Sequence, residues 1–222
     1  MQVNFEISND IALIQLDDGK KNAITPEAAA QILAALDEAE AETKAIVLAG
    51  RPGAFCAGFD LATMISGDGE AIGRLARAGG HILLRLYGMG TPLVAACTGH
   101  AFTIGALWLA ACDTRIGEAG DFKFGMTETA MGMALPLFGL EPLKARLAPT
   151  MFVQVVAQSR TLDPKGARRA GFLDDIVPAG EAIETALATA GQLAQLPAKA
   201  YAENKLAVRR QALEIMAADL NI

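Results

Sequence analysis

The stretch GAFCAGFDL (Gly53–Leu61) is rich in small residues and follows an apolar run, Ala45–Ala49. The run is typical of a buried strand, and the glycine and proline residues after it end that strand. Glycines at such a place let the backbone approach a ligand closely and offer it N–H groups. No side chain from Gly53 to Gly58 is an acid, a base or a metal ligand. The stretch is therefore either a tight strand-to-helix turn or a site whose chemistry belongs to its peptide bonds.

A second stretch has the same character. TGHAFTIGA (Thr98–Ala106) follows the apolar run Leu93–Cys97 and leads into an apolar helix over Ala106–Ala111. Two strand ends with close backbone approach can place two N–H donors around one oxygen, which is how an oxyanion hole is built. The positive end of a helix beginning near Ile104 would strengthen it. Together the two stretches predict an oxyanion hole.

These stretches belong to a set of motifs that resembles the enoyl-CoA hydratase/isomerase, or crotonase, superfamily. The set comprises Phe55–Leu61, Gly99–Ala101, Cys112–Arg115 and Gly125–Gly132, with Lys21–Ile24 matching the family's N-terminal signature. The motifs stand in the family's order and at its usual spacing, over roughly residues 3–205. The resemblance implies an α/β fold, a crotonase-like spiral of repeated ββα units with C-terminal helices. We expect residues 1–196 to form the core domain and residues 197–222 to form a C-terminal helical extension of the same domain.

Composition narrows the class of protein. The 222 residues suffice for one domain with a substantial core. The formal net charge is −6 and no basic stripe appears, so we expect no nucleic-acid partner. No long apolar span and no leader-like N-terminus occur, so we expect no membrane association. The odd number of cysteines, all in apolar contexts, predicts reduced core thiols of a cytoplasmic protein. No metal site is predicted.

Periodicity and turn signals predict the local structure. Thr25 should cap a helix that has Pro26 in its first turn. Asp113 and Arg115 are expected to make local hydrogen bonds. The remaining expected elements are strands over Val3–Ser8, Ile11–Asp17, Asp113–Gly117, Asp121–Phe124 and Asp174–Val177, a mobile loop over Ala62–Glu70, and helices over Glu70–Tyr87, Met151–Gln158, Glu181–Leu196 and Ala198–Leu220.

Glu128 is the only titratable side chain in Gly125–Gly132, and its neighbours are largely apolar. Apolar surroundings disfavour an ionised carboxylate, so the pKa of Glu128 should rise toward the range that is useful for proton transfer. The alternative is an ordinary exposed turn glutamate. The motif context favours a catalytic group.

The resemblance implies a thioester substrate, with coenzyme A as part of the substrate and no tightly bound cofactor. At matching motif positions, the oxyanion donors are the backbone N–H groups of Phe59 and Ile104, and Glu128 is the catalytic carboxylate. Relatives often have a glycine run at Thr103–Gly105, so the Ile104 side chain must point away from the thioester. Family assemblies imply a homotrimer or a dimer of trimers. The positions implied to contact substrate or coenzyme A are Lys21, Ala23, Ala57, Gly58, Asp60, Leu61, Gly105 and Leu107.

Leu107 is the main departure from the family pattern, because efficient hydratases of the family have a glutamate there. Two carboxylates then activate a water, whereas this sequence matches only one, Glu128. One carboxylate can still move a proton between two carbons. We therefore expect a 3-enoyl-CoA to 2-enoyl-CoA isomerase, with an enoyl-CoA hydratase as the main alternative. A decarboxylase, a thioester hydrolase and a non-catalytic acyl-CoA-binding relative also stay open, although the retained Glu128 argues against the last.

Overall fold

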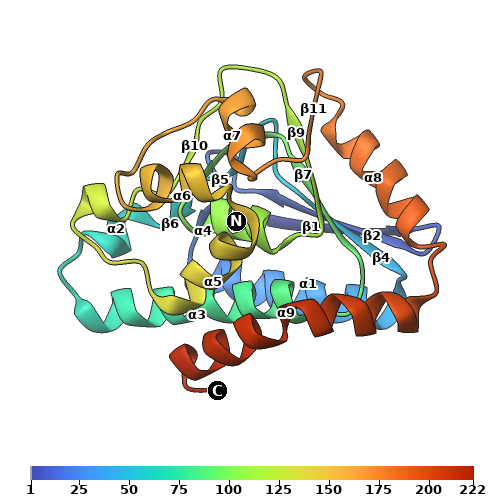
Figure 1. The fold of residues 1–222 in the computed structure, drawn as a ribbon, viewed down its shortest axis with the longest axis horizontal. Helices are drawn as coiled ribbons and strands as arrows, with labels where there is room; N and C mark the ends of the chain where they lie inside the picture. Colours follow the sequence, from blue (N-terminus) through green and yellow to red (C-terminus); the bar gives the residue numbers. More distant parts are fainter. Residues whose placement is uncertain (1) are drawn as a thin grey trace.

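The two apolar runs of the sequence form the centre of the main sheet in the computed structural model, which describes residues 2–222 (Figure 1). Every residue of both strands is buried, as expected for parallel strands that are covered on both faces. The first two strands pair antiparallel, and the other neighbours are parallel. In spatial order the sheet contains β1 (Gln2–Ser8), β2 (Ile11–Asp17), β4 (Ala45–Ala49), β7 (Leu93–Cys97), β9 (Thr114–Glu118) and β11 (Asp175–Val177).

Short strands follow the strands of the main sheet and pair with one another beside it. The short strands are β3 (Ala23–Ile24), β5 (Gly53–Cys56), β6 (Gly58–Phe59), β8 (Gly99–Phe102) and β10 (Phe124–Gly125). One small sheet has the order β10-β8-β5, and β3 pairs with β6. A helix follows each short strand or pair, so the predicted strand-strand-helix repeat is present.

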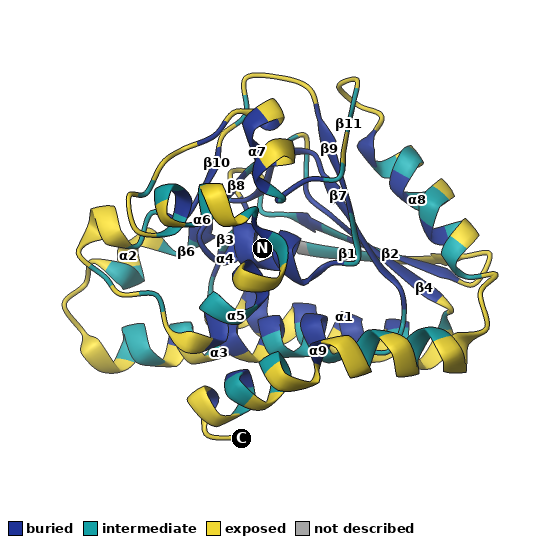
Figure 2. Ribbon diagram, in the orientation of Figure 1, coloured by how far each residue is buried: buried dark blue, intermediate teal, exposed yellow. Residues whose placement is uncertain are grey.

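Helices cover both sides of this framework (Figure 1). Helix α8 packs on β4, β7 and β9, whereas α9 packs on α3 and α5. Figure 2 shows the central strands buried and one side of α9 exposed. No helix within residues 2–222 is long and apolar enough to span a bilayer. The helices are α1 (Pro26–Glu42), α2 (Leu61–Met64), α3 (Gly69–Gly88), α4 (Ile104–Ala111), the 3-10 turn η1 (Thr129–Met131), α5 (Leu137–Arg146), α6 (Pro149–Val156), α7 (Pro164–Ala170), α8 (Ala182–Leu193) and α9 (Ala198–Leu220).

Two predicted elements are shorter than expected. The loop predicted over Ala62–Glu70 is confined to residues 65–68, because the carboxylates of Asp60 and Asp68 cap the helices α2 and α3 on either side of it. The strand predicted over Asp121–Phe124 is confined to β10 at Phe124–Gly125. Phe124 is buried, whereas Asp121 and Lys123 are exposed, so the polar residues stay outside the small sheet.

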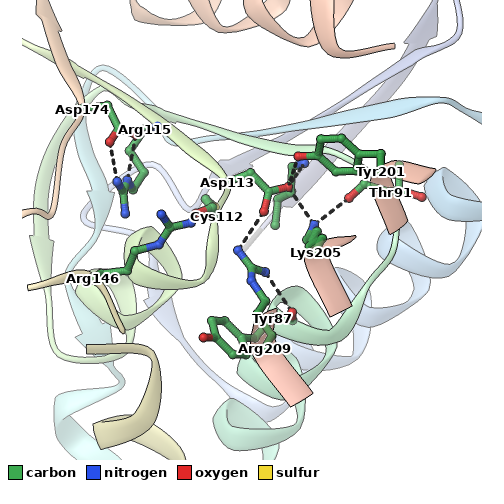
Figure 3. A network of polar contacts seen from close by, with 11 residues as sticks. Tyr87, Thr91, Cys112, Asp113, Arg115, Arg146, Asp174, Tyr201, Lys205 and Arg209 are labelled. Atoms are coloured by element: carbon green, nitrogen blue, oxygen red, sulfur yellow. Dashed lines mark hydrogen bonds and ion pairs between the residues drawn. The ribbon is translucent and has the colours of Figure 1, made fainter. Parts of the chain in front are cut away.

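The prediction of local hydrogen bonds for Asp113 was also wrong, because its carboxylate reaches α9 (Figure 3). Oδ2 of Asp113 accepts from Lys205 Nζ at 2.7 Å and from the Tyr201 hydroxyl at 3.0 Å. Oδ1 accepts from Arg209 Nη2 at 2.7 Å. The Lys205 and Arg209 side chains are only 6% and 7% exposed. Asp113 therefore joins the end of α4 to α9 through buried charges.

Arg115 likewise pairs with a distant residue rather than a local one. Its backbone N–H donates to Asp174 Oδ2 at 2.8 Å, and its Nε donates to the same oxygen at 3.0 Å. Arg115 is buried, and Asp174 directly precedes β11. The pair therefore fixes the approach of β11 to β9 at the edge of the main sheet.

We predict that Asp113→Ala lowers the free energy of unfolding by about 3–5 kcal/mol, because two buried cations would lose their carboxylate. Urea denaturation measures the change. The matched control is Lys44→Ala, which breaks the exposed pair with Asp10 and should cost no more than about 1 kcal/mol. A loss for Asp113→Ala as small as that of the control would mean that apolar packing alone holds α9.

Candidate active site

A cavity of about 810 Å³ lies where the small strands meet α3, α4 and α5. Most of the site residues predicted from the sequence line it, although they come from segments up to about a hundred residues apart. Those lining it are Lys21, Ala23, Ala57, Phe59, Leu61, Ile104, Leu107 and Glu128. The structure thus brings the predicted oxyanion donors and the predicted catalytic carboxylate to one space.

Three predicted contact residues, Gly58, Asp60 and Gly105, do not line the cavity, and each has a structural role beside it. The Asp60 carboxylate accepts from the Thr63 N–H at 2.9 Å and caps α2. A Cβ at Gly105 would lie 2.4 Å from the Cys56 carbonyl oxygen, so this glycine lets α4 pack against β5. A side chain at Gly58 would likewise collide with Thr103, so this glycine lets β6 approach the start of α4. These three residues support the wall of the cavity without facing it.

The two oxyanion stretches touch at Gly58 and Thr103, the residues that precede the two donors. Gly58 has φ of 109°, and a Cβ on it would lie 2.3 Å from Thr103 Oγ1. The absence of a side chain at Gly58 therefore permits this contact. It places the backbone of Phe59 next to the first turn of α4.

The backbone N–H groups of the two donors are not used by the hydrogen bonds of their own elements. The N–H of Asp60 donates to the Ile24 carbonyl on β3 at 2.9 Å. Successive N–H groups of a strand point to opposite edges, so that of Phe59 points away from β3. Ile104 is the first residue of α4, where N–H groups have no partner within the helix. The positive end of α4 favours negative charge there.

Thr103 holds a strained backbone at the start of α4, with φ of 48° and ψ of −119°. For a residue other than glycine such a conformation costs on the order of 1–3 kcal/mol, and it persists only where neighbours enforce it. The Thr103 N–H donates to the Gly125 carbonyl at 3.0 Å, and its carbonyl accepts from the Leu107 N–H at 3.0 Å. The first of these bonds ties the oxyanion stretch to the segment that carries Glu128.

Glu128 is half-buried, and its Oε2 is inaccessible and has no hydrogen-bond partner among residues 2–222. Burial raises the pKa of this carboxyl, and hydrogen bonds from the backbone at Glu128 and Thr127 oppose the rise in part. The expected upward shift of the pKa is confirmed. The alternative of an ordinary exposed turn glutamate was wrong.

Leu107 is almost fully buried and lines the cavity, and it packs toward α5. A Cβ at Gly139 on α5 would lie 3.2 Å from Leu107 Cδ1. Glu128 is the only carboxylate among the described residues that line the cavity. Asp68, Glu70 and Glu118, which could have supplied a second acid, do not line it.

Sequence reasoning missed two groups of residues at the cavity. One is a set of basic side chains, Lys20, Arg51 and Lys123, which join Lys21 in its lining. The Arg51 Nη1 donates to the Lys20 carbonyl at 2.8 Å, which brings two of these segments together. The other is an apolar set, Met64, Ile72, Met131, Met133, Leu135 and Phe138. Met131, Met133 and Leu135 follow Glu128 in the sequence, but the other residues come from separate loops and helices that only the folded chain assembles.

The three cysteines do not line the cavity. Cys56, Cys97 and Cys112 are free and buried. Burial raises the pKa of the Cys56 thiol and that of the Cys112 thiol to about 12. They are core residues, as the sequence predicted. Within residues 2–222 no group of three or more potential ligands could hold a metal ion.

Comparison with known proteins assigns the family. Residues 6–221 match the protein family described as enoyl-CoA hydratase/isomerase. The chain belongs to this family. A putative enoyl-CoA hydratase from Thermus thermophilus is 30% identical over 196 residues, which are 83% of this chain and 75% of the relative.

Solved structures of the enoyl-CoA hydratase/isomerase family share the fold. A family protein from Pseudomonas syringae has a TM-score of 0.94 and 35% identity, covering 99% of this chain and 95% of its own. A Mycobacterium tuberculosis protein described as an enoyl-CoA isomerase has a TM-score of 0.93 and 32% identity, covering 99% and 96%. The predicted crotonase fold is confirmed. Because these relatives are named for two different reactions, the choice between the reactions rests on the site.

The buried carboxylate predicts a pH dependence of stability. Unfolded Glu128 should titrate near the ordinary glutamate pKa of 4.5, whereas its pKa in the folded chain is higher. Ionisation of Glu128 within the fold therefore costs stability above the folded pKa and costs nothing once pH falls below the unfolded one. We predict that Glu128→Gln raises the free energy of unfolding at about pH 7.5 and that this gain fades toward about pH 4.

Urea denaturation of Glu128→Gln and the parent across this pH range measures the effect. Glu203→Gln, on the exposed side of α9, is the matched control and should show no comparable gain. A gain for Glu128→Gln that grows as the pH falls would contradict the upward shift of the pKa.

Proposed function

We propose that the chain is an acyl-CoA enzyme that converts 3-enoyl-CoA to 2-enoyl-CoA. The observation that carries the proposal is the single carboxylate, Glu128, which lines a cavity with two backbone N–H donors and the apolar Leu107. Double-bond migration needs one group that removes a proton and returns it. It needs no water, and water is what a second carboxylate would activate.

The thioester oxygen would accept hydrogen bonds from the N–H groups of Phe59 and Ile104. Such donors act on the charge that develops on the oxygen as the enolate forms, and loss of one typically costs about 100- to 1,000-fold in rate. The start of α4 behind Ile104 supports the same charge. The site suits a reaction that passes through an enolate.

In this mechanism Glu128 removes a proton from C2 of the acyl group. The electron pair moves to the thioester oxygen, giving a dienolate in which C3 and C4 keep their double bond. Glu128 then returns the proton to C4, the double bond forms between C2 and C3, and the carbonyl is restored. A raised pKa of Glu128 suits both directions of this transfer.

The basic side chains suggest how coenzyme A lies. Lys20, Lys21, Arg51 and Lys123 line the cavity, and their charge suits the phosphates of the nucleotide. The methionine and leucine side chains suit an apolar acyl chain. We therefore place the nucleotide beside the lysines and the acyl group beside Glu128 and Leu107.

An enoyl-CoA hydratase is the second candidate, favoured by the name of the Thermus thermophilus relative. Hydration requires a water held over C3, together with a group that manages the proton at C2. With Leu107 in place of an acid, Glu128 would have to do both. The apolar wall at Leu107 instead helps to keep water from the dienolate.

We predict that Glu128→Gln lowers turnover of 3-enoyl-CoA by about 100- to 10,000-fold, because the proton carrier is lost while the shape is kept. Binding of a saturated acyl-CoA, measured by calorimetry, should change only a few-fold. Glu203→Gln is the matched control for both measurements. Turnover within a few-fold of the parent would remove Glu128 from the mechanism.

Leu107→Glu tests the choice between the two reactions. We predict that the parent isomerises 3-enoyl-CoA faster than it hydrates 2-enoyl-CoA, and that Leu107→Glu raises the ratio of hydration to isomerisation. Leu107→Gln, which is polar but not ionisable, is the control for added polarity. Both rates are measured on substrates of matched chain length. Rapid hydration by the parent without isomerisation would show that the single-carboxylate mechanism is wrong.

A further inference from the structure

We infer that Gly79, in the middle of α3, is a positioning residue that sets the location of the Phe59 oxyanion donor. Gly79 does not line the cavity, so it would not touch a substrate bound there. It acts through the ring of Phe59, whose backbone N–H is one of the two proposed donors of the hole. The inference rests on the proposed function, since it concerns the same hole.

The side chains of the two donors converge on Gly79. A Cβ built there would lie 2.5 Å from both Cε1 and Cζ of the Phe59 ring and 3.5 Å from Cδ1 of Ile104. Carbon atoms in contact lie about 3.5–4.0 Å apart, so the Ile104 contact is ordinary but the ring would have to move. Gly79 is therefore the surface of α3 on which the Phe59 ring rests.

The convergence also accounts for the Ile104 side chain. The sequence required that it point away from the thioester, and its tip lies near Gly79 on α3. Helices α3 and α4 pack together here (Figure 1). One helix position thus supports a donor on the two-residue strand β6 and a donor at the start of α4.

Displacement of the Phe59 ring would also move the backbone N–H that donates the proposed catalytic hydrogen bond. The ring and the donor N–H belong to one residue, and β6 contains only Gly58 and Phe59. An oxyanion donor works at about 2.7–3.1 Å from the developing charge. A misplacement of about 1 Å can cost about 100-fold in rate. Added bulk at Gly79 should therefore lower turnover more than binding.

Intrinsic helix preference gives no reason for a glycine at this place, because glycine in a helix interior is less stable than alanine by about 1 kcal/mol. Two other glycines of α3 separate the possible reasons. A Cβ at Gly80 would meet Leu220 and Phe138, so Gly80 makes room for α9 and α5. A Cβ at Gly73 would meet only the end of the Arg77 side chain, at 3.5 Å. Gly73 is thus the matched control.

The experiment compares Gly79→Ala, Gly73→Ala and the parent by steady-state kinetics and by infrared spectroscopy of bound butyryl-CoA labelled with ¹³C at the carbonyl. Hydrogen bonds from the hole lower the carbonyl stretching frequency. We expect Gly79→Ala to lower kcat by about 30- to 100-fold with KM changed only a few-fold. We expect it to weaken the carbonyl shift, and Gly73→Ala to match the parent in both measurements.

Repeating Gly79→Ala in a Phe59→Leu variant distinguishes the proposed effect on the oxyanion donor from a general loss of folding. Phe59→Leu keeps the backbone N–H and removes the ring atoms that an alanine at 79 would strike. Adding Gly79→Ala to Phe59→Leu should therefore yield a folded protein whose kcat and carbonyl shift match those of Phe59→Leu alone. The inference would be overturned if the double variant did not fold, or if Gly79→Ala lowered kcat in the Phe59→Leu variant by as much as it does in the parent. Either result would show that Gly79 acts through contacts other than the Phe59 ring.

The results also separate this inference from the proposed function. A parent that binds butyryl-CoA but turns over no enoyl-CoA overturns the proposed reaction, and the carbonyl shifts still test Gly79. A parent that binds no acyl-CoA overturns both. An active parent whose kcat and carbonyl shift are retained in Gly79→Ala overturns the inference alone.

Discussion

The contact between Gly58 and Thr103 is the constraint on which the site depends. It joins the two strand ends whose backbone provides the oxyanion donors, and it exists because Gly58 has no side chain in the way of Thr103 Oγ1. The cost is a strained backbone at Thr103. The Thr103 N–H donates a hydrogen bond to the carbonyl of Gly125, which belongs to the third motif, and this bond helps to hold the strained conformation. Three motifs far apart in the sequence thus meet at one strained residue.

Glycine has a different use at each place around this contact. Gly105 lets α4 approach the backbone of β5, and Gly79 leaves room for the Phe59 ring. At each of these glycines a neighbouring residue occupies the space that a side chain would take. The donors are therefore fixed by packing as well as by hydrogen bonds. The carboxylate that lines the same cavity is held differently. Burial destabilises the charged form of Glu128 and thereby raises its pKa. The raised pKa suits this carboxyl to carry a proton.

Much of this could be predicted from the sequence, because periodicity and motif spacing are local signals. The apolar runs at Ala45–Ala49 and Leu93–Cys97 predicted the central strands, and the isolated carboxylate in Gly125–Gly132 predicted the pKa shift of Glu128. What could not be predicted depends on contacts across the fold. Asp113 pairs with α9 from 88 to 96 residues away, and no local pattern marks such a partner. A motif also does not distinguish a residue that lines the cavity from one that supports it, as Gly58, Asp60 and Gly105 do.

The pairing of Asp113 with α9 links distant parts of the molecule through α4. That helix has eight residues and spans about 12 Å, from Ile104 beside the cavity to the residues just before Asp113. Its two ends are thus anchored to different parts of the fold, one to the strained Thr103 and the other to the buried charges of α9. Transient detachment of α9 by local unfolding would remove the charged partners of Asp113, but its hydrogen bonds with Leu93 would still hold this end of α4 to β7. The N–H group at Ile104 therefore stands at the start of a buried helix whose other end is tied to both β7 and α9.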